Sequence, residues 1–285
     1  MNTTVHETVI QSEQGSLFVQ HTRLVDGQPT VMFVHGLGDS GLCFREAFAA
    51  PGFERCNVIV PDLPGHGRSS CAADCDYGLD AQVRRLWAVV DESDLTRVCL
   101  VGHSLGGNIA TAMAASDERF RVNGLVNVEG DLTPHDIFIS NQAVSADDRG
   151  DLERWFHEDF LEALVLNKWG RKRISSRRYY ASLWFCHLDA FLANAREICE
   201  KGGSLPGREE SEFGARFRKL NIPKMYCWGA ASLSVKTRQF LEAAGIPNQR
   251  FDRAGHAVMV DQPQEFYAFL RGFVEGLDWA RGAPA

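Results

Sequence analysis

Residues 98–115 read VCLVGHSLGGNIATAMAA and carry the pattern that decides the fold. A short apolar run leads directly into G-x-S-x-G, in which Gly102 and Gly106 flank Ser104, and a helical pattern follows. Such a serine lies on a sharp strand-to-helix turn, where the glycines relieve crowding and the hydroxyl is exposed. The helix start directs backbone N–H groups to the point where an oxyanion would develop. The stretch predicts a nucleophilic serine, because an ordinary N-cap serine would explain neither Gly106 nor Gly107.

The remaining sequence indicates an α/β protein. Short apolar runs alternate with longer helical patterns, as is typical of parallel strands crossed by helices. Residues 16–24 are expected to form a strand of an edge hairpin, followed by a turn at 25–29. Ligands of such folds bind outside the carboxyl ends of the strands, so the chemistry is expected there. Further strands are expected within residues 30–38, 56–70, 97–103, 122–130, 222–230 and 249–256.

The strand rhythm stops between Asp131 and about Leu220. This segment has apolar residues at helical spacing and is rich in Trp, Tyr and Phe, which predicts a helical insertion. The sequence GGSLPG at residues 202–207 is typical of a linker that returns the chain to the sheet. We therefore expect a core of residues 1–131 and 221–285, with the insertion at residues 132–220.

Composition and charge exclude several classes of protein. The 285 residues are 45% hydrophobic and have a net charge of −7, so one large core is possible and no basic surface invites nucleic acid. No segment approaches the apolar run of a membrane span, and the opening residues lack the pattern of an export signal. We expect a soluble, cytoplasmic protein whose oligomeric state stays open, with a homodimer among the options.

The cysteines are expected to be reduced thiols, because they are scattered through a long chain rather than concentrated in a small framework. A redox or metal role for the pair in one loop, Cys71 and Cys75, is the weaker interpretation because no second pair of ligands accompanies it. The eight cysteines are Cys43, Cys56, Cys71, Cys75, Cys99, Cys186, Cys199 and Cys227.

Four motifs in order resemble the α/β-hydrolase family: FVHGLGDS at residues 33–40, DLPGHGRS at 62–69, GHSLGG at 102–107 and AGHAVMVDQPQEFYAFL at 254–270. They resemble the oxyanion loop, a loop after the next strand, the nucleophile elbow and the catalytic histidine segment. The resemblance implies a mostly parallel sheet of eight strands with helices on both faces, and an insertion that forms a helical cap, or lid.

A serine hydroxyl needs a base that accepts its proton, and imidazole suits that task near neutral pH. The resemblance assigns this role to His256, which follows a predicted strand and precedes the closing helix. We interpret His35 as positioning the oxyanion loop, His103 as packing within the elbow and His66 as shaping its loop. The family pattern also implies an oxyanion hole made of the backbone N–H groups of Leu105 and Leu37.

The acid of the triad departs from the common pattern. Most members carry an aspartate where this chain has Ser232, and the surrounding loop has no carboxylate. Some members, among them ones like zearalenone lactonases and one branch of haloalkane dehalogenases, instead take their acid from the end of the strand that follows the nucleophile's helix. Glu129 lies at that position in this chain. Asp131 is the alternative acid. Both could also be solvated loop carboxylates, one of them paired with an arginine of the cap.

A serine nucleophile with a histidine base suits acyl transfer to water from an ester, lactone, thioester or amide. No metal or organic cofactor is required. Six Trp and an aromatic insertion favour a small, hydrophobic substrate, although cap helices also need aromatic residues for packing. The basic run RKRISSRRYY at residues 171–180 is either a solvated helix face or a surface that steers an anionic substrate.

Two further classes of function stay open. One is a cofactor-free lyase or C–C bond hydrolase on the same scaffold. The other is a ligand receptor that retains the triad, because this fold hosts functions that the sheet alone does not distinguish.

Overall fold

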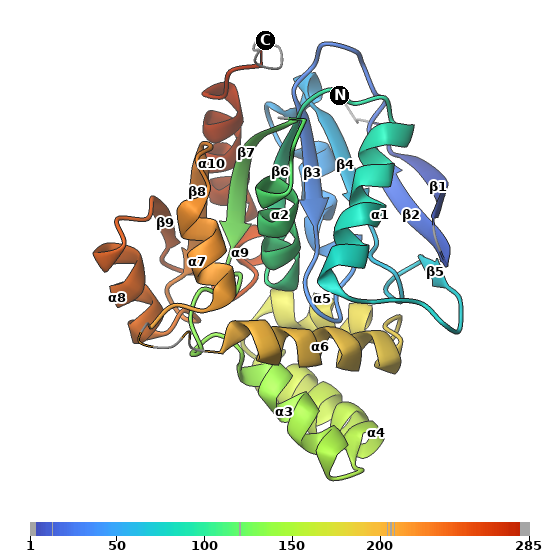
Figure 1. Cartoon of the computed structure of the whole chain (residues 1–285), viewed down its shortest axis with the longest axis vertical. Helices are drawn as coiled ribbons and strands as arrows, with labels where there is room; N and C mark the ends of the chain where they lie inside the picture. Colours follow the sequence, from blue (N-terminus) through green and yellow to red (C-terminus); the bar gives the residue numbers. More distant parts are fainter. Residues whose placement is uncertain are drawn as a thin grey trace.

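The expected α/β fold, with a mostly parallel sheet, is confirmed (Figure 1). The computed structural model describes residues 4–12, 14–119, 121–203, 205, 207 and 209–279. The described strands are β1 (His6–Ser12), β2 (Gly15–His21), β3 (Thr30–Val34), β4 (Asn57–Pro61), β5 (Ser70–Cys71), β6 (Val98–His103), β7 (Val122–Val128), β8 (Lys224–Gly229) and β9 (Asn248–Phe251).

Eight strands follow one another across the sheet in the order β1-β2-β4-β3-β6-β7-β8-β9. All neighbours from β4 to β9 are parallel, whereas β2 is antiparallel to β1 and to β4. The edge hairpin thus joins β2 to the strand before it. The two-residue β5, which pairs with β2, brings the sheet to nine strands instead of the expected eight. Two residues are too few to leave a periodic pattern in a sequence.

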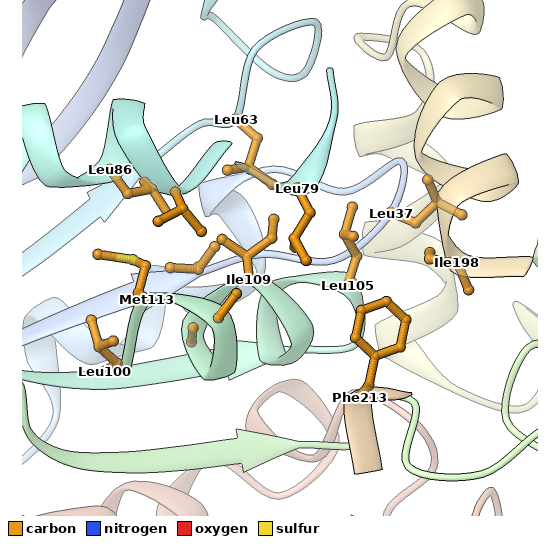
Figure 2. Packing of buried hydrophobic residues seen from close by; sticks show 14 of the residues in the cluster. Leu37, Leu63, Leu79, Leu86, Leu100, Leu105, Ile109, Met113, Ile198 and Phe213 are labelled. Atoms are coloured by element: carbon orange, nitrogen blue, oxygen red, sulfur yellow. The ribbon is translucent and has the colours of Figure 1, made fainter. Parts of the chain in front are cut away.

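Helices cover both faces of the sheet because the central strands are apolar on both sides (Figure 1). In β3, Met32 and Val34 belong to a hydrophobic cluster with side chains of α1 and α2. Figure 2 shows leucines of this cluster around Ile109. Val31 and Phe33 point the other way and share a cluster with α10. All five residues of β3 are buried, so the strand has no solvent-exposed side.

The helices lie in the connections between strands or after the last strand, β9. They are η1 (Gly41–Ala49), η2 (Phe53–Arg55), α1 (Leu79–Glu92), α2 (Leu105–Ala115), α3 (Phe138–Asp148), α4 (Leu152–Arg154), η3 (Trp155–Trp169), α5 (Ile174–Leu183), α6 (Leu188–Gly202), α7 (Glu212–Lys219), α8 (Val235–Ala243), α9 (Val258–Asp261) and α10 (Pro263–Glu275).

The segment between β7 and β8 contains the expected helices, and α3 to α6 lie across the end of the sheet toward which β7 points (Figure 1). Helix α7 also falls within the predicted range 132–220, but it packs against α2 beside the sheet. We use "the insertion" below for α3 to α6, with η3. The insertion therefore covers the strand ends where the candidate site residues lie.

Candidate active site

Ser104 occupies the sharp turn between β6 and α2, with φ 53° and ψ −123°. A non-glycine residue with positive φ is uncommon and strained, and such strain is concentrated at functional sites. The glycines around it have a clear steric reason. A Cβ on Gly106 would lie 2.1 Å from the carbonyl oxygen of Val34, and one on Gly102 would lie 2.1 Å from that of Gly106. The turn can be built only with bare backbone at these positions.

The backbone N–H groups of Leu37 and Leu105 are brought beside this turn. Parallel pairing of β3 with β6 sets Val34 opposite Gly102, so the loop after β3 runs next to the elbow. Among the hydrogen bonds of the described residues, none is donated by the N–H of Leu37 or of Leu105. Both N–H groups are therefore without an acceptor within the described residues.

Two side chains hold the loop that carries Leu37. His35 donates from Nδ1 to the carbonyl oxygen of Gly36 at 2.9 Å, and its Nε2 accepts from the N–H of Leu63 at 2.9 Å. Burial lowers the pKa of His35 to about 4, so it stays neutral and keeps one donor and one acceptor. Tyr179 of α5 donates from its hydroxyl to the carbonyl oxygen of Leu37 at 2.8 Å. The sequence analysis missed Tyr179.

Glu129 is the carboxylate in contact with His256, at 2.7 Å from Oε2 to Nδ1. It follows β7 directly and has φ 50°, so a second strained residue ends the strand adjacent to β6. Its side chain is 4% exposed, and that of His256 is 52% exposed. Asp131 instead accepts from the amide of Asn108 at 2.6 Å. Ser104, Glu129, His256 and Asp131 all line one pocket, but Glu129 contacts the histidine whereas Asp131 is hydrogen-bonded to Asn108 of α2.

The electrostatics of this pair favour a charged imidazole. Loss of water on the side of the ring that faces the protein acts to lower the pKa of His256, but the hydrogen bond and charge of Glu129, with the charges of Asp131 and Asp136, raise it above its usual 6.5 overall. Ser232, at the position where most members carry the acid, donates to Glu129 Oε1 at 2.5 Å, and the N–H of Gly229 donates to the same oxygen at 2.7 Å. The serine thus fixes the relocated carboxylate.

The two other histidines of the motifs, His103 at the end of β6 and His66 in the loop after β4, are buried. His103 Nε2 lies 3.2 Å from the carbonyl oxygen of His256, and the two rings are 4.7 Å apart. His66 donates from Nδ1 to the carbonyl oxygen of Pro64 at 3.0 Å. Neither reaches Ser104 by a hydrogen bond, and within the described chain Ser104 Oγ has no such partner at all. Catalytic hydrogen bonds are often loose before substrate binds.

A cavity of about 430 Å³ opens onto Ser104, Glu129 and His256. Its volume lies in the range of small-molecule sites. The insertion contributes much of its wall, together with the loop after β8. Apolar and aromatic lining residues include Phe138, Ile139, Trp169, Tyr179, Ile198 and Leu233.

Two arginines of the basic run at residues 171–180 bind the core. Arg173 donates to Asp261 Oδ2 and to the carbonyl oxygen of Arg253, each at 3.0 Å, next to the loop that carries His256. Arg178 forms a bidentate pair with Glu46 at 2.6 and 2.7 Å. These arginines join the insertion to the site rather than forming a wholly solvated face.

A family model described as "Alpha/beta hydrolase family" matches residues 31–269, and the chain belongs to this family. The match includes the elbow, Glu129 and His256. No helix within the described residues combines the length and apolar character needed to cross a membrane.

The curated proteins that are similar to this chain carry the names of different activities. The magnesium-chelatase 30 kDa subunit of Rhodobacter capsulatus is 40% identical over 109 residues, which are 38% of this chain and only 37% of that relative. The 2-succinyl-6-hydroxy-2,4-cyclohexadiene-1-carboxylate synthase of Pectobacterium atrosepticum is 27% identical over 89% of this chain and 97% of its own length. Among solved structures, N-acyl homoserine lactonase AidH has a TM-score of 0.73 at 21% identity and covers 99% of this chain and 100% of its own. That likeness shows the fold.

Proposed function

We propose that the protein is a cofactor-free serine hydrolase that cleaves an ester or lactone bond through an acyl-enzyme on Ser104. The observation that carries the proposal is the 2.7 Å contact of Glu129 with His256 in the pocket that also exposes the strained Ser104. A carboxylate that holds the imidazole in one tautomer and stabilises its charged form is what a serine nucleophile requires.

In this mechanism, His256 takes the proton of Ser104 as the hydroxyl oxygen attacks the carbonyl carbon. Glu129 stabilises the resulting imidazolium, and the oxyanion accepts from the N–H groups of Leu37 and Leu105. His256 then protonates the leaving alcohol and the acyl-enzyme remains. A water molecule deprotonated by His256 repeats the sequence and releases the acid, so that Ser104 recovers its proton.

The substrate is expected to be small and largely hydrophobic. The cavity holds about 430 Å³, and apolar and aromatic side chains such as Phe138, Trp169 and Ile198 line it together with polar ones. We also propose that residues 132–220 act as a cap over the site, because α3 to α6 cover the strand ends (Figure 1).

A lyase or a C–C bond hydrolase is the second candidate. The relative that is similar over 89% of this chain is named as a synthase, and a 2-hydroxy-6-oxononadienedioate/2-hydroxy-6-oxononatrienedioate hydrolase of Cupriavidus pinatubonensis is 25% identical over 87% of this chain. Both reactions could use the same serine and histidine. Products of a substrate panel would separate them from ester hydrolysis.

The first test is intact mass after exposure to a reactive phosphonate, with Ser104→Ala as the matched control. We expect one adduct on the wild type and none on the variant, because only an activated serine reacts. An ester, lactone and thioester panel then follows. A folded wild type that forms no adduct would argue against a working triad and would favour a ligand receptor or a lyase.

A further inference from the structure

Three side chains beside the elbow form a cluster that the proposed reaction does not use. They are Asp39 in the loop after β3, Cys43 in η1 and His103 at the end of β6. One carboxylate oxygen, the thiol sulfur and one ring nitrogen all lie within 4.8 Å of one another. All three residues are buried, with at most 5% of any one exposed.

His103 supplies an independent sign that a ligand is missing. Its Nε2 faces the carbonyl oxygen of His256, so the ring proton belongs on Nε2 and Nδ1 carries a lone pair. Burial and the nearby His256 lower the pKa of His103 well below 6.5, which keeps the ring neutral. Nδ1 is nonetheless buried with no hydrogen-bond partner among the described residues. Such an atom costs about 1–3 kcal/mol if it stays unpaired.

The charges around the cluster permit a cation. Asp39 Oδ1 accepts from the N–H of Ser40 at 2.8 Å. The guanidinium of Arg178 acts on Asp39, and both carboxylate oxygens of Glu46 already pair with it. Burial, followed by the charge of Asp39, raises the pKa of the Cys43 thiol well above 9, and Asp62 adds to this effect, so a bound cation has to displace the thiol proton.

We propose that Asp39, Cys43 and His103 bind one Zn²⁺ ion, which reaches them through the active-site pocket and stops hydrolysis. A thiolate, an imidazole and a carboxylate form a donor set typical of zinc. All three residues line the pocket that contains Ser104, which provides both a path for the ion and a position for a fourth ligand. Binding displaces the thiol proton of Cys43 into solvent.

Inhibition follows from the geometry and rests on the proposed function. Zinc–ligand bonds of about 2.0–2.3 Å in a tetrahedron hold the donor atoms about 3.5 Å apart. The three donors lie within 4.8 Å of one another, and a bound ion would fix them at these separations. Asp39 and His103 are in the two segments that carry Leu37 and Ser104. A displacement of about 1 Å between oxyanion donors and nucleophile costs about 100-fold in rate.

The test separates binding from activity. Co²⁺ is titrated into metal-free protein, and the thiolate-to-cobalt absorption is followed for the wild type, Cys43→Ala and Asp39→Asn. Hydrolysis is measured for each protein with and without Zn²⁺, as a ratio. Cys99→Ala is the matched control, because Cys99 is equally buried but lies outside the cluster. Cys71→Ala tests a rival site, since Cys71 Sγ lies 3.9 Å from His187 Nδ1.

We expect one equivalent of Co²⁺ to give the absorption in wild type, Cys99→Ala and Cys71→Ala, and at least a 10-fold weaker affinity in Cys43→Ala and Asp39→Asn. Zn²⁺ should lower hydrolysis about 100-fold only where the absorption forms. An absorption that survives Cys43→Ala, or one lost in Cys71→Ala, would overturn the site. Binding at Cys43 without inhibition would overturn the effect on rate. A protein without hydrolase activity would refute the proposed function while leaving the cobalt result to decide the metal site.

Discussion

The hydroxyl of Tyr179 lies 2.8 Å from the carbonyl oxygen of Leu37 and so joins α5 to the loop beside Ser104. Burial, with the charge of Asp39 next in effect, raises the pKa of Tyr179 well above 10, so the hydroxyl remains a donor. The insertion therefore helps to set where the N–H of Leu37 points.

Tyr179→Phe removes this donor and keeps the ring. We expect kcat to fall about 5-fold, equivalent to roughly the 1 kcal/mol of one hydrogen bond, with little change in KM. Tyr180→Phe is the matched control, because Tyr180 donates to Glu162 within the insertion. The measurement is kcat and KM of both variants on one activated ester. Equal losses of kcat in both variants would show that Tyr179 does not position the loop of Leu37.

Glu129→Gln and Asp131→Asn distinguish the two candidate acids. Loss of the acid that orients the histidine of a serine triad costs about 10⁴-fold in kcat. We expect a loss of that order for Glu129→Gln, which contacts His256, and a far smaller one for Asp131→Asn, which contacts Asn108. The reverse ranking in single-turnover rates would assign the acid to Asp131.

The pH profile should report His256, which must be neutral to accept the proton of Ser104. Its pKa is raised above 6.5 in the folded protein, so kcat/KM should be lost as pH falls through a midpoint above 6.5. Glu129→Gln removes the largest favourable contribution to the charged form, and the midpoint of any residual activity should move down. A midpoint unchanged by that substitution would show that another group controls the profile.

Asp131 should affect stability even if it has no catalytic role. Burial, followed by the charge of Asp136, raises its pKa to about 7. A carboxyl whose pKa is raised by folding contributes stability at low pH that is lost as pH rises from about 4 to 7. We therefore expect the free energy of unfolding of Asp131→Asn, relative to that of the wild type, to be higher at pH 8 than at pH 5. Urea unfolding of both proteins at the two pH values measures this difference.

Two glycine substitutions should act in opposite directions. Gly106→Ala places a Cβ 2.1 Å from the carbonyl oxygen of Val34, and we expect a loss of about 3 kcal/mol in the free energy of unfolding. Gly272→Ala, in the middle of α10, meets no atom within 4 Å and should gain about 0.5–1 kcal/mol. Thermal unfolding of both variants measures the contrast, and a neutral Gly106→Ala would contradict the steric account of the elbow.

The sequence was informative where chemistry and local geometry coincide. Ser104 and its glycines form a contiguous pattern, and the order of the motifs predicted the sheet and its parallel strands. Glu129 could be nominated because the loop around Ser232 lacks a carboxylate. Its contact with His256 spans 127 residues and depends on the pairing of β7 with β8, which only the structure shows.

Contacts made by ordinary residue types could not be predicted. Tyr179 lies in a run that also suits a solvated helix, and its partner Leu37 is 142 residues away. The pattern of α7 likewise shows an apolar face but does not say which helix covers it, so its packing against α2 was not evident from the sequence. Periodicity identifies a buried face, whereas the partner follows from the tertiary arrangement.

Helix α5 is attached to two loops of the candidate active site, by Tyr179 to the loop of Leu37 and by Arg173, the residue before the helix, to the loop of His256. For protein engineering, this means that the insertion is not an interchangeable module. A chimera that receives the corresponding segment of a relative would inherit a new substrate pocket but lose both attachments unless a tyrosine and an arginine are grafted at these positions. Transplanting specificity into this scaffold therefore begins with two pocket residues whose bonds to the core must be kept.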